Sequence, residues 1–221
     1  MNVISSMKSL AHEFLDSFHC VDIPSKKNLG REDADNWFIT TANINSNSVV
    51  YSGGVGKDIF FELQLSKEFN PKIYLFDPSP TGLKTIESMT LPPNIKFYPY
   101  GLAGQDSVAS FSPPTNAAEG SFRLDDDGTV KFECRAISSL MKENGHTKID
   151  LLKIDIEGFE YDVLDDLLDK NIEIGQIAVE FHSFYGNIGP SKTQLMLQKL
   201  KDHGYRLFHK RYHDYSFVKQ G

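Results

Sequence analysis

The chain has 221 residues, 40% of them hydrophobic and 12% aromatic, which suits one globular domain with a sizeable core. Its formal net charge is −7, and an acidic chain without basic runs argues against a primary role in binding nucleic acid or anionic membranes. No stretch is apolar enough to predict insertion into a membrane. Two isolated cysteines, Cys20 and Cys134, form neither a disulfide framework nor a zinc site, and they favour a cytoplasmic location.

Residues 3–18 repeat apolar side chains at helical spacing and predict an amphipathic helix rather than a signal peptide. We expect this helix to pack on the domain itself or on the partner subunit of a homodimer. Residues 21–47 are polar and rich in turn-forming residues, with Trp37-Phe38-Ile39 as their one apolar group. They predict a connecting segment that covers the site.

Strands and helices alternate through the rest of the chain. Apolar runs predict strands at residues 49–51, 72–76, 95–98, 149–156, 172–182, 205–208 and 215–218. Helical periodicity appears at residues 57–69, 83–89, 137–143, 161–168 and 191–203. This order predicts an α/β fold, with helices on both faces of a mostly parallel sheet that has one antiparallel strand.

Residues 104–136 break this alternation. They carry polar and apolar residues in turn, with Gly, Pro and acidic turns, and predict a β-hairpin-like insertion that pairs 108–112 with 130–134. We therefore expect a single domain over residues 1–221. Its core would span residues 48–221, after the helix and connecting segment of residues 1–47.

A strand, a glycine-rich turn and a helix follow one another around Gly53-Gly54-Val55-Gly56. Glycines permit positive φ and a close approach of the backbone to a ligand, and a helix N terminus adds unpaired N–H groups. The next strand ends about twenty residues later in Asp77, where a carboxylate can accept both hydroxyls of an adenosine ribose. Both features also have structural readings, because three-glycine loops are common and Asp77 could cap the helix that follows Pro78.

NAD and S-adenosylmethionine both bind at such a turn. The dinucleotide fingerprint needs a further glycine three residues after Gly56, where this chain has Ile59. The departure favours a ligand without a pyrophosphate, hence S-adenosylmethionine, and leaves an NAD-linked oxidoreductase as the alternative. Asp58 could face the amino group of the methionine part or simply stabilise the helix start.

Charged residues mark the ends of two predicted strands. Lys153, Asp155 and Glu157 lie two apart, so their side chains share one face, and Glu180 and His182 repeat the pattern. Burying such charges without partners costs roughly several kcal/mol. Ligands of open α/β sheets gather at the carboxyl ends of the strands. If the two strands are neighbours, their ends should line one crevice.

These side chains could perform acid–base chemistry or bind a cation. His182, with an ordinary pKa of about 6.5, is the candidate general base. Asp155 and Glu157 would orient an acceptor hydroxyl, and Asp155 with Glu180 could hold Mg²⁺ or another divalent cation. Structural readings stand beside these roles: a buried Lys153–Asp155 pair, Glu157 as a helix cap, and His182 as a packing residue.

Four motifs occur in order over residues 48–218: Tyr51-Ser52-Gly53-Gly54-Val55-Gly56-Lys57-Asp58-Ile59, Phe76-Asp77-Pro78-Ser79, Leu151-Leu152-Lys153-Ile154-Asp155-Ile156-Glu157-Gly158-Phe159-Glu160 and Glu180-Phe181-His182. Together they resemble the motifs of FkbM-type S-adenosylmethionine-dependent methyltransferases, in particular their methyltransferase-like branch. The resemblance implies the class I methyltransferase fold, with a seven-stranded sheet whose last strand is antiparallel. It also implies O-methylation of a hydroxyl on a sugar, a glycan or a small metabolite.

The resemblance further implies a layout for the cofactor. The glycine turn (Gly53, Gly54 and Gly56) would pass under the methionine part, Asp77 would hold the ribose, and Gly101-Leu102-Ala103 would lie beside the adenine. The chain departs from the pattern at Ser52, where many family members carry an acidic residue, so Asp58 would contact the methionine amino group instead. A non-catalytic member that keeps the sheet for binding or assembly is a further alternative.

Overall fold

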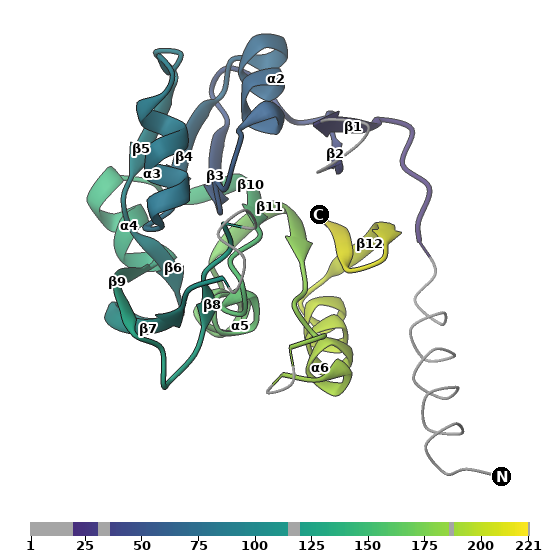
Figure 1. The fold of residues 1–221 in the computed structure, drawn as a ribbon. Helices are drawn as coiled ribbons and strands as arrows, with labels where there is room; N and C mark the ends of the chain where they lie inside the picture. The colour runs from purple at the N-terminus through teal and green to yellow at the C-terminus, as the bar shows by residue number, and fades with distance from the viewer. Residues whose placement is uncertain (1–19, 31–35, 115–119, 186–187, 221) are drawn as a thin grey trace, which may run out of the picture.

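A seven-stranded sheet forms the centre of the computed structural model, which describes residues 20–30, 36–114, 120–185 and 188–220 (Figure 1). The strands lie in the order β12-β13-β11-β10-β3-β4-β5. Their bounds are Val49–Gly53 (β3), Lys72–Phe76 (β4), Ile95–Tyr98 (β5), Lys148–Ile154 (β10), Glu173–Glu180 (β11), Tyr205–Arg211 (β12) and Asp214–Lys219 (β13). Strand β13 runs in the direction opposite to the other six, so its pairings with β11 and β12 are antiparallel and the remaining pairings are parallel. The predicted α/β fold with an antiparallel last strand is confirmed; the helix expected over residues 3–18 lies outside the described residues.

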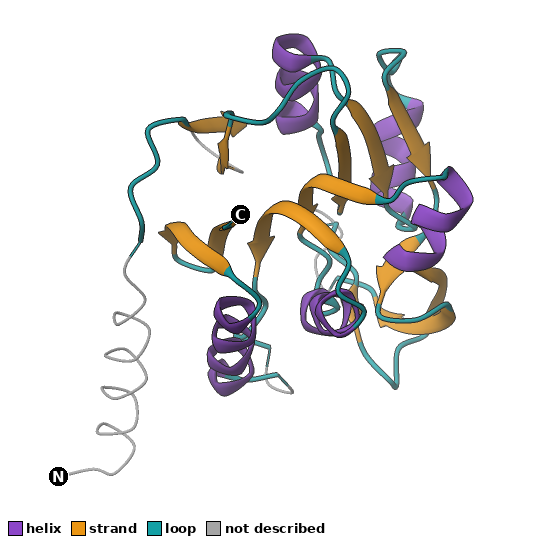
Figure 2. Ribbon diagram, turned by 180° about the vertical axis from the view of Figure 1, so that it is seen from behind, coloured by secondary structure: helices purple, strands orange, loops and turns teal. Residues whose placement is uncertain are grey.

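Helices cover both faces of the sheet (Figure 2). One face carries α2 (Phe60–Phe69) and α3 (Pro80–Glu87), and the other carries α4 (Ile137–Asn144), α5 (Glu160–Asp169) and α6 (Pro190–Asp202). Successive side chains of a strand point to opposite faces, so Leu151 packs in the cluster that contains Leu65 of α2, and Leu152 in the cluster that contains Leu164 of α5. None of the described helices is long and apolar enough to cross a membrane.

A smaller, four-stranded sheet follows the third strand of the core. It contains β6 (Gly101–Ala103), β7 (Ser107–Ser112), β8 (Arg123–Leu124) and β9 (Val130–Ala136), in the order β6-β9-β7-β8. The strands expected at 108–112 and 130–134 are present, since β7 pairs with β9 in antiparallel register. The backbone N–H of Leu124 donates to the carbonyl of Glu157 at 3.2 Å, which ties this sheet to the end of β10.

The expected connecting segment contains a short hairpin, β1 (Lys26–Gly30) and β2 (Asn36–Thr40). Apolar burial fixes β2, because Trp37 and Ile39 lie in the core cluster of the α2 face. The Gln176 side chain of β11 also bonds both the N–H and the carbonyl of Thr40, each at 2.9 Å. The hairpin therefore docks on the central sheet.

Candidate active site

A cavity of about 880 Å³ opens at the carboxyl ends of the central strands. The glycine turn after β3 and both charged strand ends line it, as do Trp37 of β2 and side chains of the small sheet. The predicted cofactor residues Gly54, Gly56, Asp58, Asp77 and Leu102 are in its wall. Gly53 lies in β3 beneath Leu102, where an added Cβ would come within 2.7 Å of the Leu102 Cδ1.

The glycine turn brings the backbone against the end of β10. Gly54 has φ +86°, and a Cβ on it would lie 1.9 Å from the carbonyl oxygen of Asp155, so only glycine fits. Gly56 also has a positive φ, but no atom of the described residues lies within 4 Å of an added Cβ. The space beside Gly56 is therefore open to a ligand, which fits a turn built for close approach.

Asp77 fastens this turn to the end of β4. Its Oδ2 accepts from the N–H groups of Val55 and Gly56 at 2.9 and 3.0 Å, and its Oδ1 accepts from the N–H of Ser79 at 2.7 Å. The cap of α3 is Ser79, whose hydroxyl accepts from the N–H of Gly82, so the helix-capping reading of Asp77 is wrong. The ribose contact of Asp77 stays a prediction.

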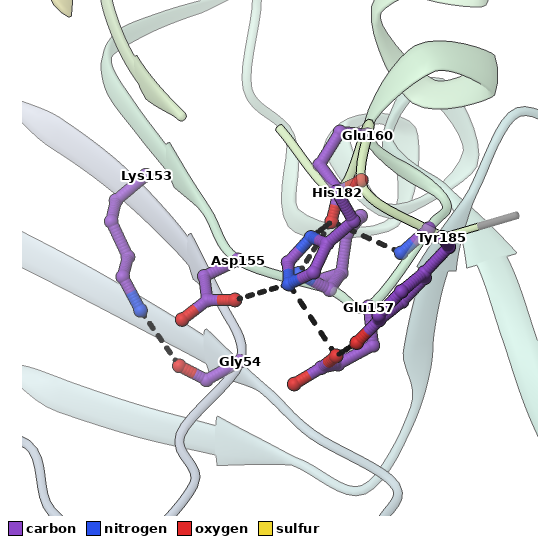
Figure 3. A network of polar contacts seen from close by, with 9 residues as sticks. Gly54, Lys153, Asp155, Glu157, Glu160, His182 and Tyr185 are labelled. Carbon is purple, nitrogen blue, oxygen red and sulfur yellow. Dashed lines mark hydrogen bonds and ion pairs between the residues drawn. The ribbon is translucent and has the colours of Figure 1, made fainter. Parts of the chain in front are cut away.

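The two charged strand ends meet as expected, because β10 and β11 are parallel neighbours. His182 lies between carboxylates: its Nε2 is 3.4 Å from Glu157 Oε2 and 3.7 Å from Asp155 Oδ1 (Figure 3). Its Nδ1 is 2.9 Å from Glu160 Oε1 on the other side of the ring. Asp155, Glu157 and His182 thus offer ligand atoms within 4.8 Å of one another.

Glu160 connects His182 to the loop that follows β10. Its Oε1 accepts from the N–H groups of Ile156 and Gly158 as well as meeting His182, and its side chain is fully buried. The loop that it holds includes Glu157, whose φ of +56° is costly for a residue other than glycine. Glu157 makes no helix cap, because α5 has Phe159 at its N-cap position without a side-chain bond.

The FkbM methyltransferase domain model matches residues 26–207, which is most of the chain. The chain belongs to the FkbM methyltransferase family. Within this family it is 27% identical over 174 residues to the probable methyltransferase-like protein 24 of Homo sapiens, covering 72% of this chain and 42% of that protein. It is 24% identical over 131 residues to the hexuronic acid methyltransferase AglP of Haloferax volcanii, covering 58% of this chain and 54% of that protein. The FkbM chain described here thus spans about half the length of these curated relatives.

Solved structures resemble this FkbM domain at low similarity. The fibrillarin pre-rRNA processing protein of Methanococcus jannaschii superimposes with a TM-score of 0.48 and 12% identity, over 91% of this chain and 85% of that one. TrmK of M. capricolum, solved with S-adenosylhomocysteine, superimposes with a TM-score of 0.39 and 16% identity, over 80% and 62%. The family assignment rests on the domain match, and it favours S-adenosylmethionine over the NAD alternative.

Electrostatics alter the role expected for His182 in this FkbM domain. Burial alone would lower its pKa, but the hydrogen bond with Glu160 and the charges of Glu160, Asp155 and Glu157 outweigh burial and raise the pKa to about 9. The expectation of an ordinary imidazole pKa is therefore wrong. At neutral pH the ring is an imidazolium, because it lies among carboxylates.

Two carboxyl groups that line the cavity have raised pKa values. Burial raises the pKa of Asp155 to about 6, although the charges of Lys153 and His182 oppose it. Burial and then the charge of Asp155 raise the pKa of Glu180 to about 8. Glu180 lines the cavity but is not in the group of three whose ligand atoms lie within 4.8 Å of one another, and the expected cation pair of Asp155 and Glu180 stays a prediction.

The structure adds to the readings of Lys153, Asp58 and Glu160; for Asp58 it shows a helix-start bond, one of its two expected roles, and its cofactor contact stays a prediction. Lys153 donates to the carbonyl of Gly54 at 2.8 Å instead of pairing with Asp155 (Figure 3). Asp58 Oδ1 accepts from the N–H of Phe60 at 3.1 Å, a local bond at the helix start. Glu160 contacts His182; it is the last residue of the ten-residue motif, but the sequence analysis gave it no role in the site.

Proposed function

We propose that the chain transfers a methyl group to a hydroxyl of a sugar-type acceptor. S-adenosylmethionine supplies an electrophilic methyl group on a positively charged sulfur. One observation carries the proposal: the glycine turn and the cluster of Asp155, Glu157 and His182 share a single cavity. The relative named as a hexuronic acid methyltransferase supports a sugar as acceptor.

The part of the cavity that aromatic side chains line suits a hydroxylated ring. Its lining includes the aromatic residues Phe111, Phe122, Phe132, Phe184 and Tyr185. The guanidinium of Arg123 lies 4.9 Å from the centre of the Tyr185 ring, and the Tyr185 hydroxyl donates to Glu157 Oε2. Flat rings next to a few convergent polar groups are typical of a pocket that orients a small polar ligand. We therefore assign this part of the cavity to the acceptor.

The acceptor hydroxyl must lose its proton as the new bond forms, because an alcohol is a weak nucleophile. We assign the proton to the Asp155 carboxylate, which is ionised at neutral pH yet more basic than an ordinary aspartate. The His182 imidazolium holds Asp155 and Glu157 in place. As the O–CH₃ bond forms and the CH₃–S bond breaks, the hydroxyl proton moves to Asp155 and a neutral thioether leaves. Positioning supplies much of the rate, since the methyl group is already activated.

A divalent cation is the second candidate for activating the hydroxyl. The observation that favours it is the carboxylate and imidazole geometry of Asp155, Glu157 and His182. Glu160 would then fix the tautomer by accepting from His182 Nδ1, leaving Nε2 as the ligand atom. Asp155 would orient the acceptor in either case.

The test is a panel of acceptors with labelled S-adenosylmethionine. Hexuronic acids, neutral hexoses and glycans made of each are compared, and release of S-adenosylhomocysteine is measured. We expect turnover with a sugar acceptor and a loss of at least about a hundredfold in Asp155→Asn, with cofactor affinity kept. Asp126→Asn, in an acidic surface turn of the small sheet, is the matched control.

Two outcomes would contradict these assignments. Absence of turnover with every sugar would remove the acceptor class, and full activity of Asp155→Asn would remove the proton acceptor. The same assay after exhaustive chelation, with add-back of Mg²⁺ or Mn²⁺, separates the two routes to activation. Unchanged turnover in the chelated protein excludes the cation, and a loss restored by add-back establishes it.

A further inference from the structure

Two buried charges line the cavity beside the glycine turn, apart from the cluster around His182. Glu62, on the first turn of α2, is 3% exposed, and Lys153, on β10, is 6% exposed. Lys153 is the cation whose expected pairing with Asp155 the structure does not show. A buried charge without a compensating partner costs several kcal/mol, roughly. Each of these two therefore needs either a partner in the protein or a partner that arrives with a ligand.

The hydrogen bonds to protein partners use only part of the hydrogen-bonding capacity of Glu62 and of Lys153. One carboxylate oxygen of Glu62 accepts from the hydroxyl of Ser52. The ammonium of Lys153 donates to the carbonyl of Gly54 and lies 5.0 Å from the centre of the Trp37 ring. In the part of the chain that the structure describes, neither side chain forms a close ion pair with the other or with a third charged group, although the charges of Lys153 and Asp155 attract each other over a longer distance. A carboxylate accepts about four hydrogen bonds and an ammonium donates three, so both keep unused capacity.

The position of Glu62 on a helix start does not account for its burial. An acidic residue in the first turn interacts favourably with the helix dipole, and it does so at the surface as well. An exposed side chain would supply that effect without losing its hydration. Asp58, four residues earlier, is part-exposed and already bonded to the N–H of Phe60. Burial of Glu62 against a cavity wall is thus better explained by a cationic ligand group.

We propose that Glu62 binds the α-ammonium, and Lys153 the α-carboxylate, at the amino-acid end of S-adenosylmethionine. The proposal rests on the proposed use of this cofactor. The amino-acid end carries one positive and one negative group on the same carbon, and the wall beside the glycine turn presents the complementary pair. In this arrangement the Ser52 hydroxyl orients the Glu62 carboxylate. Glu62, ten residues further along the chain, thus takes the place of the acidic residue that many family members carry at position 52.

Ligands that lack one group at a time test the pair by calorimetry, without an activity readout. S-adenosylhomocysteine has the whole amino-acid end, its decarboxylated analogue lacks the carboxylate, and 5′-methylthioadenosine lacks both groups. We expect Glu62→Gln to weaken S-adenosylhomocysteine by about tenfold to a hundredfold and to leave 5′-methylthioadenosine unchanged. Lys153→Met should weaken S-adenosylhomocysteine by about the same factor and the decarboxylated analogue far less.

The controls separate a lost contact from a damaged fold. Glu68→Gln changes a carboxylate on the outer side of the same helix, where it pairs with Lys27, and should leave all three affinities unchanged. In the unmodified chain, the decarboxylated analogue should bind at least about tenfold more weakly than S-adenosylhomocysteine. This comparison needs no substitution, so it holds even if Lys153→Met disturbs the turn.

Equal affinity of Glu62→Gln and the unmodified chain for S-adenosylhomocysteine would overturn the role of Glu62. An equal loss for 5′-methylthioadenosine would overturn it too, because that loss would come from the turn. Equal binding of S-adenosylhomocysteine and its decarboxylated analogue would overturn the role of Lys153. If the ligand dependence is found but no sugar acceptor is methylated, the amino-acid site stands and the proposed acceptor class fails.

Discussion

At the scale of single residues, His182 differs from a free histidine because carboxylates from two parts of the chain surround it. Glu160 comes from α5, and Asp155 and Glu157 follow β10. Together they raise the pKa of the ring to about 9, so the proposed mechanism requires a base among the acids. The ionised form of Asp155 meets that requirement.

This assignment predicts a bell-shaped dependence of kcat/KM on pH. The rate should rise as Asp155 loses its proton near pH 6 and fall as the His182 imidazolium loses its proton near pH 9. If His182 were the base, only a rise through about pH 9 would appear, because the base acts in its deprotonated form. The profile is measured in chelating buffer.

Two variants separate the groups that titrate in this range. Glu180→Gln removes the carboxyl whose pKa is about 8 and should leave both limbs in place. Glu160→Gln removes the main charge that keeps His182 protonated, so the alkaline limb should move to lower pH. An unmoved limb in Glu160→Gln would show that another group sets it. His213, whose pKa is lowered by burial and by the charge of His182, is another titratable neighbour, and a third variant, His213→Gln, should also leave the limbs in place.

At the scale of elements, the turn after β3 is held from three sides. The Gly54 N–H donates to the carbonyl of Phe76, and the Lys153 ammonium donates to the Gly54 carbonyl. The Asp77 carboxylate accepts from the N–H groups of Val55 and Gly56. Its shape depends on these bonds, so it should tolerate no side chain at position 54.

Gly54→Ala should therefore lower the free energy of unfolding by more than about 3 kcal/mol and abolish cofactor binding. A Cβ would overlap the Asp155 carbonyl, and the positive φ adds its own cost. Gly145→Ala is the matched control: its φ is also positive, at +71°, but within the described parts of the chain no atom lies within 4 Å of the added Cβ. That variant should cost only about 1–2 kcal/mol and keep cofactor affinity. Denaturant unfolding and calorimetry give both quantities, and equal losses in the two variants would contradict the overlap.

The elements also show where sequence reasoning succeeds and where it stops. The apolar run of β10 predicts a buried strand, and its neighbour β11 brings His182 to Asp155 as expected. In contrast, β1 carries the polar sequence Lys26–Gly30, which has no strand pattern, and its pairing with β2 decides its structure. Likewise β8 has only two residues, too few to show any alternation.

The residues of the site can be predicted from the sequence, but their protonation states cannot. Strand spacing places Asp155, Glu157, Glu180 and His182 together, yet the pKa of His182 depends on Glu160, which reaches it from a helix. Glu62 looks like any acid on a first helical turn until its burial is known. Contacts between elements, rather than local pattern, supply these properties.

At the scale of the whole molecule, one sheet separates two apolar clusters. Leu65 of α2 and Leu164 of α5 are both fully buried, on opposite faces. Leu151 and Leu152 of the same strand reach one cluster each, so a strand of the central sheet belongs to both. We therefore expect residues 48–221 to unfold as one unit.

Leu65→Ala and Leu164→Ala should each destabilise the chain by about 2–5 kcal/mol, since each leaves a cavity in a packed cluster. Their effects should add within about 0.5 kcal/mol in the double variant, because the residues share no contact across the sheet. Leu195→Ala on α6, where the side chain is 73% exposed, is the control and should change stability by less than about 0.5 kcal/mol. Two separate unfolding transitions would show that the faces are independent units.

Trp37 has a consequence for measurement. It is the single tryptophan of the chain, is 4% exposed, and lines the cavity with the Lys153 ammonium 5.0 Å from its ring centre. All indole emission of the protein therefore originates at the cavity wall. The molecule carries its own optical probe, and a change in emission when a ligand is added reports occupancy of this cavity without any label.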